Sequence, residues 1–391
     1  MDTRHSPPSG IAELEMARLL FVFGTRPEAI KLCPLIEYLR RAPDPLTPRV
    51  CVTAQHRSML DQVLDAFSVR PDHDLDLMKP GQTLAQTTAA VVGRLESVIA
   101  EESPDFVVVQ GDTSSTLGGA LAAFYARVPV VHIEAGLRTG NPLAPFPEEM
   151  NRRLVTTLST LHMAATESAA RALRNEGVAA GHIAVTGNTV IDAVLAVREK
   201  LLDKRIARPE WPFLDPRKKL VLVTAHRRES FGQAFERICR AVRKLASRPD
   251  VQVVYPVHRN PNVMDPVERL LRDAPHVHLV DPLAYVPFVD LMMRSHFILT
   301  DSGGIQEEAP SLGKPVLVMR EETERNEGIE AGLSLLVGTN LDAIVRESHR
   351  LLDDPAHFNS MARTHNPYGD GHACERITTA LNQFITQTGR R

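Results

Sequence analysis

Short runs of hydrophobic residues, each closed by turn-forming residues, recur along the whole chain. Most are continuous rather than alternating, which is typical of strands covered on both faces. The first half contains six such runs: Leu19–Phe23, Val50–Thr53, Phe106–Val109, Val128–Ile133, Met163–Thr166 and Ile183–Thr186. The second half contains six more: Leu220–Thr224, Val251–Tyr255, Val277–Val280, Phe297–Thr300, Val316–Met319 and Ser334–Val337. We predict a strand of a parallel sheet at each run.

Helical patterns lie between these runs, for example over Leu117–Arg127 and Phe235–Ala246. Strand and helix alternating in this way predict parallel sheets with right-handed crossovers. The alternation is interrupted at Leu201–Lys219, where prolines and basic residues are dense, as in an interdomain linker. The fold class is therefore α/β, with two Rossmann-like, doubly wound parallel-sheet domains facing each other.

This pattern divides the chain into five predicted segments. Residues 1–17 form a polar, disordered leader, 18–200 the N-terminal domain, 201–219 the linker and 220–369 the C-terminal domain. Residues 370–391 follow a turn and are predicted to form a helix that packs back on the N-terminal domain.

Composition narrows the class of protein. The 45 Lys and Arg residues are balanced by 48 acids, and a net charge of -3 argues against nucleic-acid binding. The first apolar run, Leu19–Phe23, is far shorter than the ~7–15 residues of a secretory signal or the ~20 of a membrane span. Four cysteines lie far apart without a CxxC pair, so apolar packing in a reducing compartment is favoured over disulfides. We therefore expect a cytoplasmic protein that does not associate with membranes.

Polar residues gather where predicted strands end. In parallel sheets, ligands bind outside the carboxyl ends of the strands. Five loops of this kind carry charge: Gly24–Glu28, Gln110–Thr113, Glu134–Arg138, Ala225–Glu229 and Asp301–Glu308. The first three belong to the first domain and the last two to the second, so a site between the domains is predicted.

The loop containing Ser302, Gly303 and Gly304 suits a diphosphate. Small residues let an anion approach the backbone, and the following helix offers free N–H groups. Ser302 as an ordinary helix cap is the alternative. Glu308, one turn further, is placed to reach a ribose, unless it lies on a solvated helix face.

Other basic groups fit the same anion. Thr25, Pro27 and Glu28 resemble a capping box with proline at the helix start, which leaves Arg26 and Lys31 unexplained except as phosphate ligands or surface charges. His226 ends a strand beside two arginines, and His258 has a similar place with less support; both remain open to purely structural roles.

Three acids, Asp112, Glu134 and Glu148, come from separate loops of the first domain. If they converge, like charges raise at least one pKa and provide an acid and a base near pH 7; the alternative is that they serve as caps or ion-pair partners. No G-x-G-x-x-G, Walker A, H-E-x-x-H or His/Cys metal spacing is present, so neither a cofactor nor a metal is predicted.

The motifs together resemble the non-hydrolysing UDP-N-acetylglucosamine 2-epimerases of bacteria, in order over Arg18–Ile377. The matching stretches are Phe23–Lys31, Gln55–Arg57, Gly111–Thr113, His132–Gly140, Pro147–Glu149, His226–Gly232, Asp301–Pro310, Thr323–Arg325 and Asn366–Gly371. The resemblance implies the fold of two-domain nucleotide-sugar glycosyltransferases, with UDP-N-acetylglucosamine and UDP as ligands. It also implies a homodimer and a role in polysaccharide biosynthesis.

The resemblance also assigns roles to residues of this sequence. It implies acid/base roles for Asp112, Glu134 and Glu148, and places Arg26, Lys31 and His226 around the sugar and diphosphate. The uracil lies by Phe288 and the backbone of Leu283, the phosphates on Ser302, Gly303 and Gly304, and Glu308 and Arg325 contact the substrate. A second, activating UDP-N-acetylglucosamine is bound in such proteins, and Gln55, Arg57, Gln82 and His258 stand where it would lie. Gln110 and Ser58 depart from residues common in the family.

The reaction implied is reversible epimerisation at C2 to UDP-N-acetylmannosamine. The proton at C2 of the sugar is not next to a carbonyl, so its direct abstraction by a side chain is prohibitive. Each unit of difference between the pKa values of the proton and the base adds ~1.4 kcal/mol to the barrier. Without a nicotinamide motif, elimination and re-addition of UDP is the favoured route. The alternatives are a glycosyltransferase of the same fold, a hydrolysing epimerase, a 2-epimerase acting on a modified UDP-sugar, and a non-catalytic sugar-nucleotide sensor.

Overall fold

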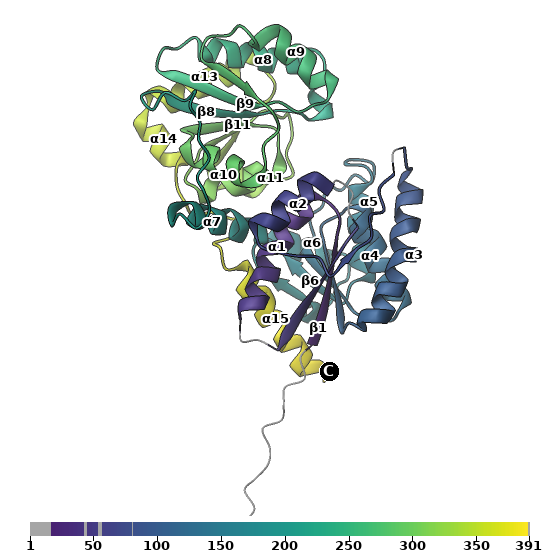
Figure 1. Ribbon diagram of the computed structural model, residues 1–391. Helices are drawn as coiled ribbons and strands as arrows, with labels where there is room; N and C mark the ends of the chain where they lie inside the picture. Colours follow the sequence, from purple (N-terminus) through teal and green to yellow (C-terminus); the bar gives the residue numbers. More distant parts are fainter. Residues whose placement is uncertain (1–16, 43–44, 54–56, 80, 390–391) are drawn as a thin grey trace, which may run out of the picture.

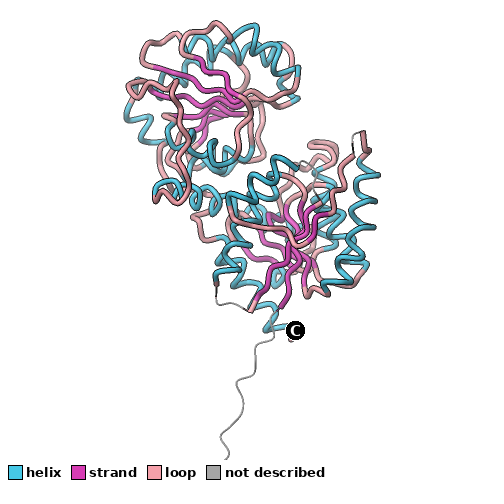
Figure 2. The backbone as a smooth tube through the Cα atoms, viewed as in Figure 1, coloured by secondary structure: helices cyan, strands magenta, loops and turns pink. Residues whose placement is uncertain are grey.

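The computed structural model describes residues 17–42, 45–53, 57–79 and 81–389. The chain forms two lobes, each built around one parallel sheet with helices on both faces (Figures 1 and 2). Each of the twelve predicted runs overlaps a strand, and one further strand of two residues, His73–Asp74, had no hydrophobic signal. The predicted leader lies outside the described residues except for Ala17, which begins the first strand.

The seven described strands of the N-terminal lobe are arranged in the order β3-β2-β1-β4-β5-β6-β7, all parallel. The strands are β1 (Ala17–Phe23), β2 (Leu46–Val52), β3 (His73–Asp74), β4 (Phe106–Gln110), β5 (Val130–Ala135), β6 (Leu161–Ala164) and β7 (Ile183–Val185). The helices are α1 (Arg26–Arg41), α2 (Arg57–Ala66), α3 (Leu84–Glu102), α4 (Ser114–Tyr125), α5 (Glu148–Leu158), α6 (Glu167–Asn175) and α7 (Thr189–Leu202).

The C-terminal lobe has the order β10-β9-β8-β11-β12-β13, again parallel. Its strands are β8 (Lys219–Thr224), β9 (Val251–Pro256), β10 (Val277–Val280), β11 (Phe297–Thr300), β12 (Val316–Val318) and β13 (Ser334–Leu336). The helices from here to the chain end are α8 (Gln233–Ala246), α9 (Pro261–Leu271), α10 (Tyr285–Arg294), α11 (Gly303–Ser311), α12 (Asn326–Glu330), α13 (Leu341–Asp353), α14 (Pro355–Met361) and α15 (Ala373–Thr388).

The continuous hydrophobic runs are explained by burial on both faces of each sheet. In β1, Leu19 and Phe21 pack into one hydrophobic cluster while Leu20 and Val22 pack into another on the opposite face. Because side chains alternate along a strand, covering both faces requires every position to be apolar.

The two lobes are joined by packing as well as by the chain. One hydrophobic cluster runs from the N-terminal sheet through α7 to residues of the C-terminal sheet, such as Leu222 and Ile298. Helix α7 lies between the lobes, against α1, α10 and α11 (Figure 1).

Two further segments connect the lobes. The chain between α7 and β8 is tied to the C-terminal lobe because the buried Asp290 carboxylate accepts hydrogen bonds from Arg208 Nε (2.6 Å) and Trp211 Nε1 (2.8 Å). Helix α15 returns to the N-terminal lobe, where the Phe384 ring meets Phe106 at 6.2 Å between centroids (Figure 1).

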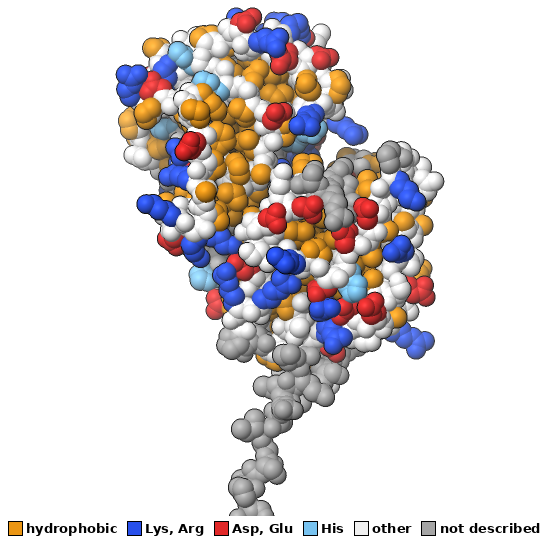
Figure 3. Space-filling model, viewed as in Figure 1, with side chains coloured by type: hydrophobic (Ala, Val, Ile, Leu, Met, Phe, Trp, Pro, Cys, Tyr) orange, Lys and Arg blue, Asp and Glu red, His pale blue; other side chains and the backbone are white. Residues whose placement is uncertain are grey.

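Charge on the surface is mixed. On the face in Figure 3, basic and acidic side chains are interspersed over both lobes, in agreement with the small net charge. All four cysteines are buried and unpaired. Among the described residues, no helix is both long and apolar enough to cross a membrane.

Candidate functional site

The charged loops predicted to form a site do meet between the lobes. Because all strands of each sheet are parallel, the loops after β1, β4, β5 and β7 share one edge of the N-terminal sheet. Those after β8 and β11 share the facing edge of the C-terminal sheet. A hydrogen bond from Asn188 to Glu307 crosses from one edge to the other, and Arg26 lies near enough to Glu308 for their charges to interact.

The loop after β1 is fixed by a buried carboxylate. Glu28 accepts hydrogen bonds from the backbone N–H groups of Gly24 (3.0 Å) and Thr25 (2.7 Å), as predicted for the glutamate of a capping box. Gly24 lies so close to β2 that a Cβ would stand 1.9 Å from Thr53 Oγ1, so only glycine fits. This local structure holds Arg26 at the start of α1.

Glu134 occupies a strained position in the centre of the site. It lies at an irregularity of β5 and has a φ of 61°, a left-handed conformation that is costly for a residue with a Cβ. Strain of this kind persists where surrounding contacts enforce it and is common at functional sites.

The contacts of Glu134 account for its position. Lys31 Nζ donates to Oε1 (2.5 Å) and Oε2 (2.6 Å), Asn188 Nδ2 donates to Oε1 (2.9 Å), and Gln110 Nε2 donates to Oε2. Burial raises the pKa of Glu134, but the charge and hydrogen bond of Lys31 outweigh it, so the pKa is below its ordinary value. The expectation of a raised pKa does not hold for this acid.

A chain of polar contacts leads from Glu134 to the other lobe. Asn188 Nδ2 also donates to Glu307 Oε2 (3.1 Å), and Arg325 Nε donates to Glu307 Oε1 (3.0 Å). Burial raises the pKa of Glu307, and the nearby Glu134 raises it further, against the opposing charges of Arg325 and Lys31. These buried side chains thus form a continuous row of polar contacts from one lobe to the other.

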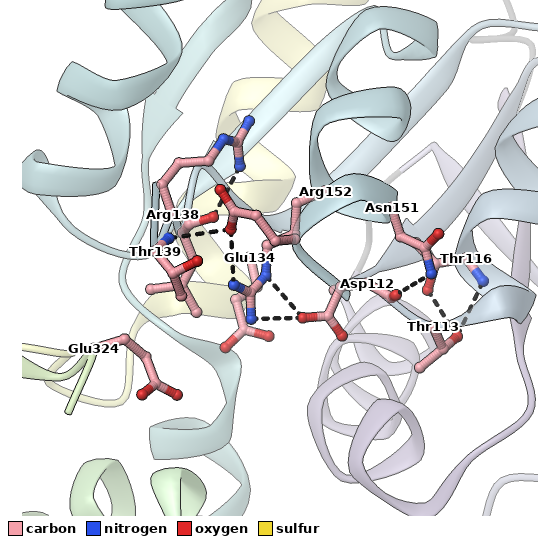
Figure 4. A network of polar contacts seen from close by, with 12 residues as sticks. Asp112, Thr113, Thr116, Glu134, Arg138, Thr139, Asn151, Arg152 and Glu324 are labelled. Carbon is pink, nitrogen blue, oxygen red and sulfur yellow. Dashed lines mark hydrogen bonds and ion pairs between the residues drawn. The ribbon is translucent and has the colours of Figure 1, made fainter. Parts of the chain in front are cut away.

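Asp112 is held by the first turn and a half of α5 (Figure 4). Arg152 donates to its Oδ2 through Nε (2.8 Å) and lies 2.8 Å away through Nη2, while Asn151 Nδ2 donates to its backbone carbonyl (2.7 Å). Arg152 is in turn paired with the fully buried Glu149 at 3.3 Å. Asp112 is therefore oriented by a buried cation that has its own counter-ion.

Glu148 begins α5, next to this group. Its Oε2 is buried and has no hydrogen-bond partner among the described residues. The three acids thus lie at one edge of the sheet, but no hydrogen bond or ion pair joins any two of them in the described part of the chain.

The loop after β11 forms a small turn with unused donors. Ser302 caps α11, but its hydroxyl makes no capping hydrogen bond. The guanidinium of Arg325 lies directly against Gly303, where a Cβ would stand 2.8 Å from Cζ. The helix N-terminus and Arg325 together make this turn a site for an anion.

Glu308 does not lie on a solvated helix face, which was the alternative to a ribose contact. It is buried and accepts a hydrogen bond from Tyr285 Oη (2.7 Å), and Arg26 lies close enough to act on its charge. Burial raises the pKa of Glu308 to about 7. It is therefore half protonated near neutral pH.

His226 lies at the end of β8. The buried Asp301 accepts hydrogen bonds from the backbone N–H groups of His226 and Arg227, both at 2.7 Å. The ring of His226 is 41% exposed and stacks on His258, with centroids 5.4 Å apart. Burial lowers the pKa of His226, against the charge of Asp301, whose Oδ1 lies 3.5 Å from Nδ1.

The remaining candidates are more peripheral. Leu283 and Phe288 are half-buried, before and within α10. Gln82 is half-buried and accepts a hydrogen bond from the Lys79 N–H (2.9 Å). Gln55 lies outside the described residues, and only the backbone of Arg57, at the start of α2, is described.

A cavity of about 1200 Å³ is lined from both lobes, but neither the three proposed acids nor the Ser302–Gly304 turn is among its lining residues. Arg138, Thr139 and Thr166 contribute from the N-terminal lobe, and Arg227, Arg320 and Glu324 from the C-terminal lobe. Figure 4 shows Glu324 on the opposite side of the gap from Arg138 and Thr139. The volume is sufficient for a ligand of sugar-nucleotide size.

Sequence reasoning missed three residues that organise this site: Asn188, Glu307 and Arg152. Asn188 follows β7, so it belongs to the same class of strand-end loop as the others and carried a usable signal. Glu307 lies within the stretch Asp301–Pro310, but no role was predicted for it. Arg152 lies in a helix, and only the tertiary structure reveals its contact with Asp112.

Comparisons with known proteins agree with one another. Residues 39–382 match the family model described as UDP-N-acetylglucosamine 2-epimerase. The UDP-N-acetylglucosamine 2-epimerase of Escherichia coli K12 is 55% identical over 369 residues, covering 93% of this chain and 98% of that protein.

Solved structures give the same result. The UDP-GlcNAc 2-epimerase of Neisseria meningitidis, bound to UDP-GlcNAc, superposes with a TM-score of 0.88 at 47% identity, covering 94% of this chain and all of that one. The glycosyltransferase of kitacinnamycin, at 13% identity and a TM-score of 0.64 over 94% of this chain and 98% of that one, shares the fold alone.

Proposed function

This chain belongs to the UDP-N-acetylglucosamine 2-epimerase family and has its 2-epimerase activity, and we propose that the reaction takes place between the acids of the N-terminal lobe and the Ser302–Gly304 turn. The proposal rests on one observation above all. Buried contacts run from Glu134 through Asn188 and Glu307 to Arg325, which lies against Gly303. A UDP-sugar with its diphosphate at the turn thus has its sugar near the carboxylates.

Binding of UDP follows from the groups at the C-terminal edge. The diphosphate is placed at the N-terminus of α11, where free N–H groups and the helix dipole favour negative charge. Arg26 and Arg325 add positive charge, and Glu308 accepts from a ribose hydroxyl. Phe288 and the backbone of Leu283 hold the uracil.

Epimerisation by elimination uses groups from the facing edges of both sheets. A carboxylate takes the C2 proton while the C1–O bond breaks, and its electron pair leaves with UDP. The resulting glycal has a C1–C2 double bond. A proton delivered to the opposite face of C2, with UDP adding again at C1, gives UDP-N-acetylmannosamine. Asp112, Glu134 and Glu148 are the groups for these proton transfers, and His226, Arg26 and the helix start stabilise the departing anion.

Turnover in deuterated water tests this route. We expect one deuterium at C2 of the product, observed by NMR, because the proton taken by a carboxylate exchanges with solvent. Retention of protium at C2 would refute elimination and reprotonation. The same spectra, recorded with UDP-N-acetylglucosamine alone, distinguish epimerisation from transfer or hydrolysis, since those release free UDP.

We also propose that a second UDP-N-acetylglucosamine binds next to the first. His258 stacks on His226, and the family resemblance implies that Gln82, Gln55 and Arg57 contact the same second ligand. Sigmoidal initial rates that become hyperbolic in His258→Ala support this role, and hyperbolic rates in the wild type contradict it.

We propose that the protein works in the cytoplasm. We also propose that it forms a homodimer through a surface of the N-terminal lobe. Helices α4 and α5 pack together and leave large apolar side chains exposed: Phe124, Tyr125, Met150 and Leu154. An apolar area of this kind is typical of an interface. Light scattering should give the dimer mass for the wild type and the monomer mass for Leu154→Asp; a wild-type monomer refutes the proposal.

A further inference from the structure

Asn188 links the two lobes through two buried hydrogen bonds, one of which goes to a proposed catalytic acid, Glu134. It caps α7, which lies between the lobes in Figure 1, and is 3% exposed. Its Oδ1 accepts a hydrogen bond from the Val190 N–H at 3.1 Å. This bond fixes the orientation of the side-chain amide, so Nδ2 points away from the helix.

The two hydrogens of Nδ2 are divided between the lobes. One bond goes to Glu134 Oε1 (2.9 Å) in the N-terminal lobe and the other to Glu307 Oε2 (3.1 Å) in the C-terminal lobe. Two buried carboxylates that approach the same point repel each other unless donors lie between them. Lys31 binds both oxygens of Glu134 and Arg325 binds Oε1 of Glu307, while the amide of Asn188 lies between the two acids and bonds to one oxygen of each.

The backbone of Glu134 gives this arrangement a functional consequence. Because its φ of 61° is strained, the position of the carboxylate depends on the contacts that hold it. One of those contacts depends in turn on Glu307, which also holds Arg325 against Gly303.

We infer that Asn188 is a positioning residue for the epimerisation: its amide orients Glu134 and couples that orientation to the seating of Arg325 at the Ser302–Gly304 turn. Occupation of the turn by a diphosphate is thereby transmitted to the acid that handles the sugar. The inference rests on the proposed role of Glu134 in the chemistry.

A purely structural role is the competing explanation, since Asn188 also caps a helix. Aspartate and serine are equally good caps but cannot donate to both carboxylates. We therefore compare Asn188→Asp and Asn188→Ser with the wild type in kcat, KM and urea unfolding. We expect kcat to fall about 10²-fold in both variants, with KM changed less than about 3-fold. Asn188→Ser adds no third carboxylate and remains informative if Asn188→Asp fails to fold.

Two further variants separate position from charge and from general stability. Asn188→Asp combined with Glu307→Gln restores the number of charges but leaves Glu134 without the hydrogen bond from residue 188, so kcat should stay low. Asn340→Ala is the control for the loss of a helix cap, because Asn340 is exposed and caps α13 by accepting a hydrogen bond from the Ala343 N–H at 3.1 Å. We expect it to lower stability and keep kcat.

The outcomes are distinguishable. Recovery of kcat in the double variant, wild-type kcat in Asn188→Ser, or a rise in KM at unchanged kcat each overturns the inference. Glu134→Gln is measured in parallel: if it is fully active, the proposed role of Glu134 fails. If it is inactive while both Asn188 variants are active, only the inference fails.

Discussion

The two sides of the interlobe site hold their polar groups in different states. On the N-terminal side, Glu134 receives hydrogen bonds from Lys31, Asn188 and Gln110, and Asp112 from Arg152. On the C-terminal side, Glu307 and Glu308 are also paired, but the Ser302 hydroxyl at the start of α11 makes no capping hydrogen bond.

We relate this difference to the source of the negative charge: on the N-terminal side it belongs to the protein, and on the C-terminal side it arrives with the diphosphate. Glu134 and Asp112 have partners that are built into the fold, which avoids reorganisation during the reaction. The C-terminal turn is made for a charge that arrives with the ligand, so its donors stay available. Substitutions on the N-terminal side should therefore act on kcat, and those on the C-terminal side on binding.

The largest effect is expected from Glu134→Gln. Loss of the carboxylate should lower kcat by about 10²-fold or more while UDP-N-acetylglucosamine still binds, because the amide cannot accept the proton. Steady-state rates and calorimetric titration measure the two quantities.

Glu102→Gln is the control for this prediction. Glu102 is also a buried acid of the same lobe, but it ends α3 and pairs with Arg49 and His73, away from the interlobe edge. This variant should lose stability and keep kcat. Equal rates in Glu134→Gln and the wild type would contradict the comparison.

Glu308 should make stability depend on pH. In the folded protein its pKa is about 7, above the ordinary glutamate value of 4.5, so between these two pH values the folded state retains a proton that the unfolded state has lost. Stability from this group is complete below about pH 4.5 and decreases as pH rises toward 7, by up to about 3 kcal/mol.

Urea unfolding at pH 5 and pH 8 measures this dependence. Glu308→Gln should reduce the decrease between the two values, and the remainder comes from other buried acids such as Glu28 and Glu307, whose pKa values burial also raises. Glu324, whose pKa is about 2 because Arg325 and Arg320 outweigh its burial, changes stability only at lower pH and does not interfere. The same decrease in the variant and the wild type would refute the assignment to Glu308.

Gly303→Ala tests the seating of Arg325. The added Cβ would stand 2.8 Å from Cζ, so the guanidinium must move, and we expect KM to rise about 10-fold with a smaller change in kcat. Gly93→Ala is the control: a Cβ there meets nothing within 4 Å, and the helix should gain about 0.5–1 kcal/mol. An unchanged KM in Gly303→Ala would show that Arg325 does not bind the substrate.

Much of the fold was predictable because its signals are local. The buried strands are continuous apolar runs, such as Phe106–Val109, and the loops that follow them carry the charged residues of the site. Glu28 was recognised as part of a helix cap because the capping box spans only four residues.

The partners of the acids were not predictable from local patterns. Lys31 reaches Glu134 across 103 positions of sequence, and Arg152 reaches Asp112 across 40. The sequence also does not indicate that Glu308 is buried beside Tyr285, which is what raises its pKa. Charge states in this site depend on tertiary contacts, whereas the position of each loop depends on the strand before it.

The smallest effect, and the sharpest comparison, is expected from two helix caps. Thr113 caps α4, accepts a hydrogen bond from the Thr116 N–H (3.1 Å) and donates one to Glu28 (2.6 Å), so Thr113→Ala should cost about 1–2 kcal/mol of stability. Ser302 caps α11 without such a bond, so Ser302→Ala should cost only a few tenths of a kcal/mol but weaken UDP binding about 3- to 10-fold. Urea unfolding and calorimetry with UDP provide both values. If Ser302→Ala lost as much stability as Thr113→Ala and bound UDP normally, the C-terminal turn would be as self-contained as the N-terminal cluster, and the contrast between the two sides would be wrong.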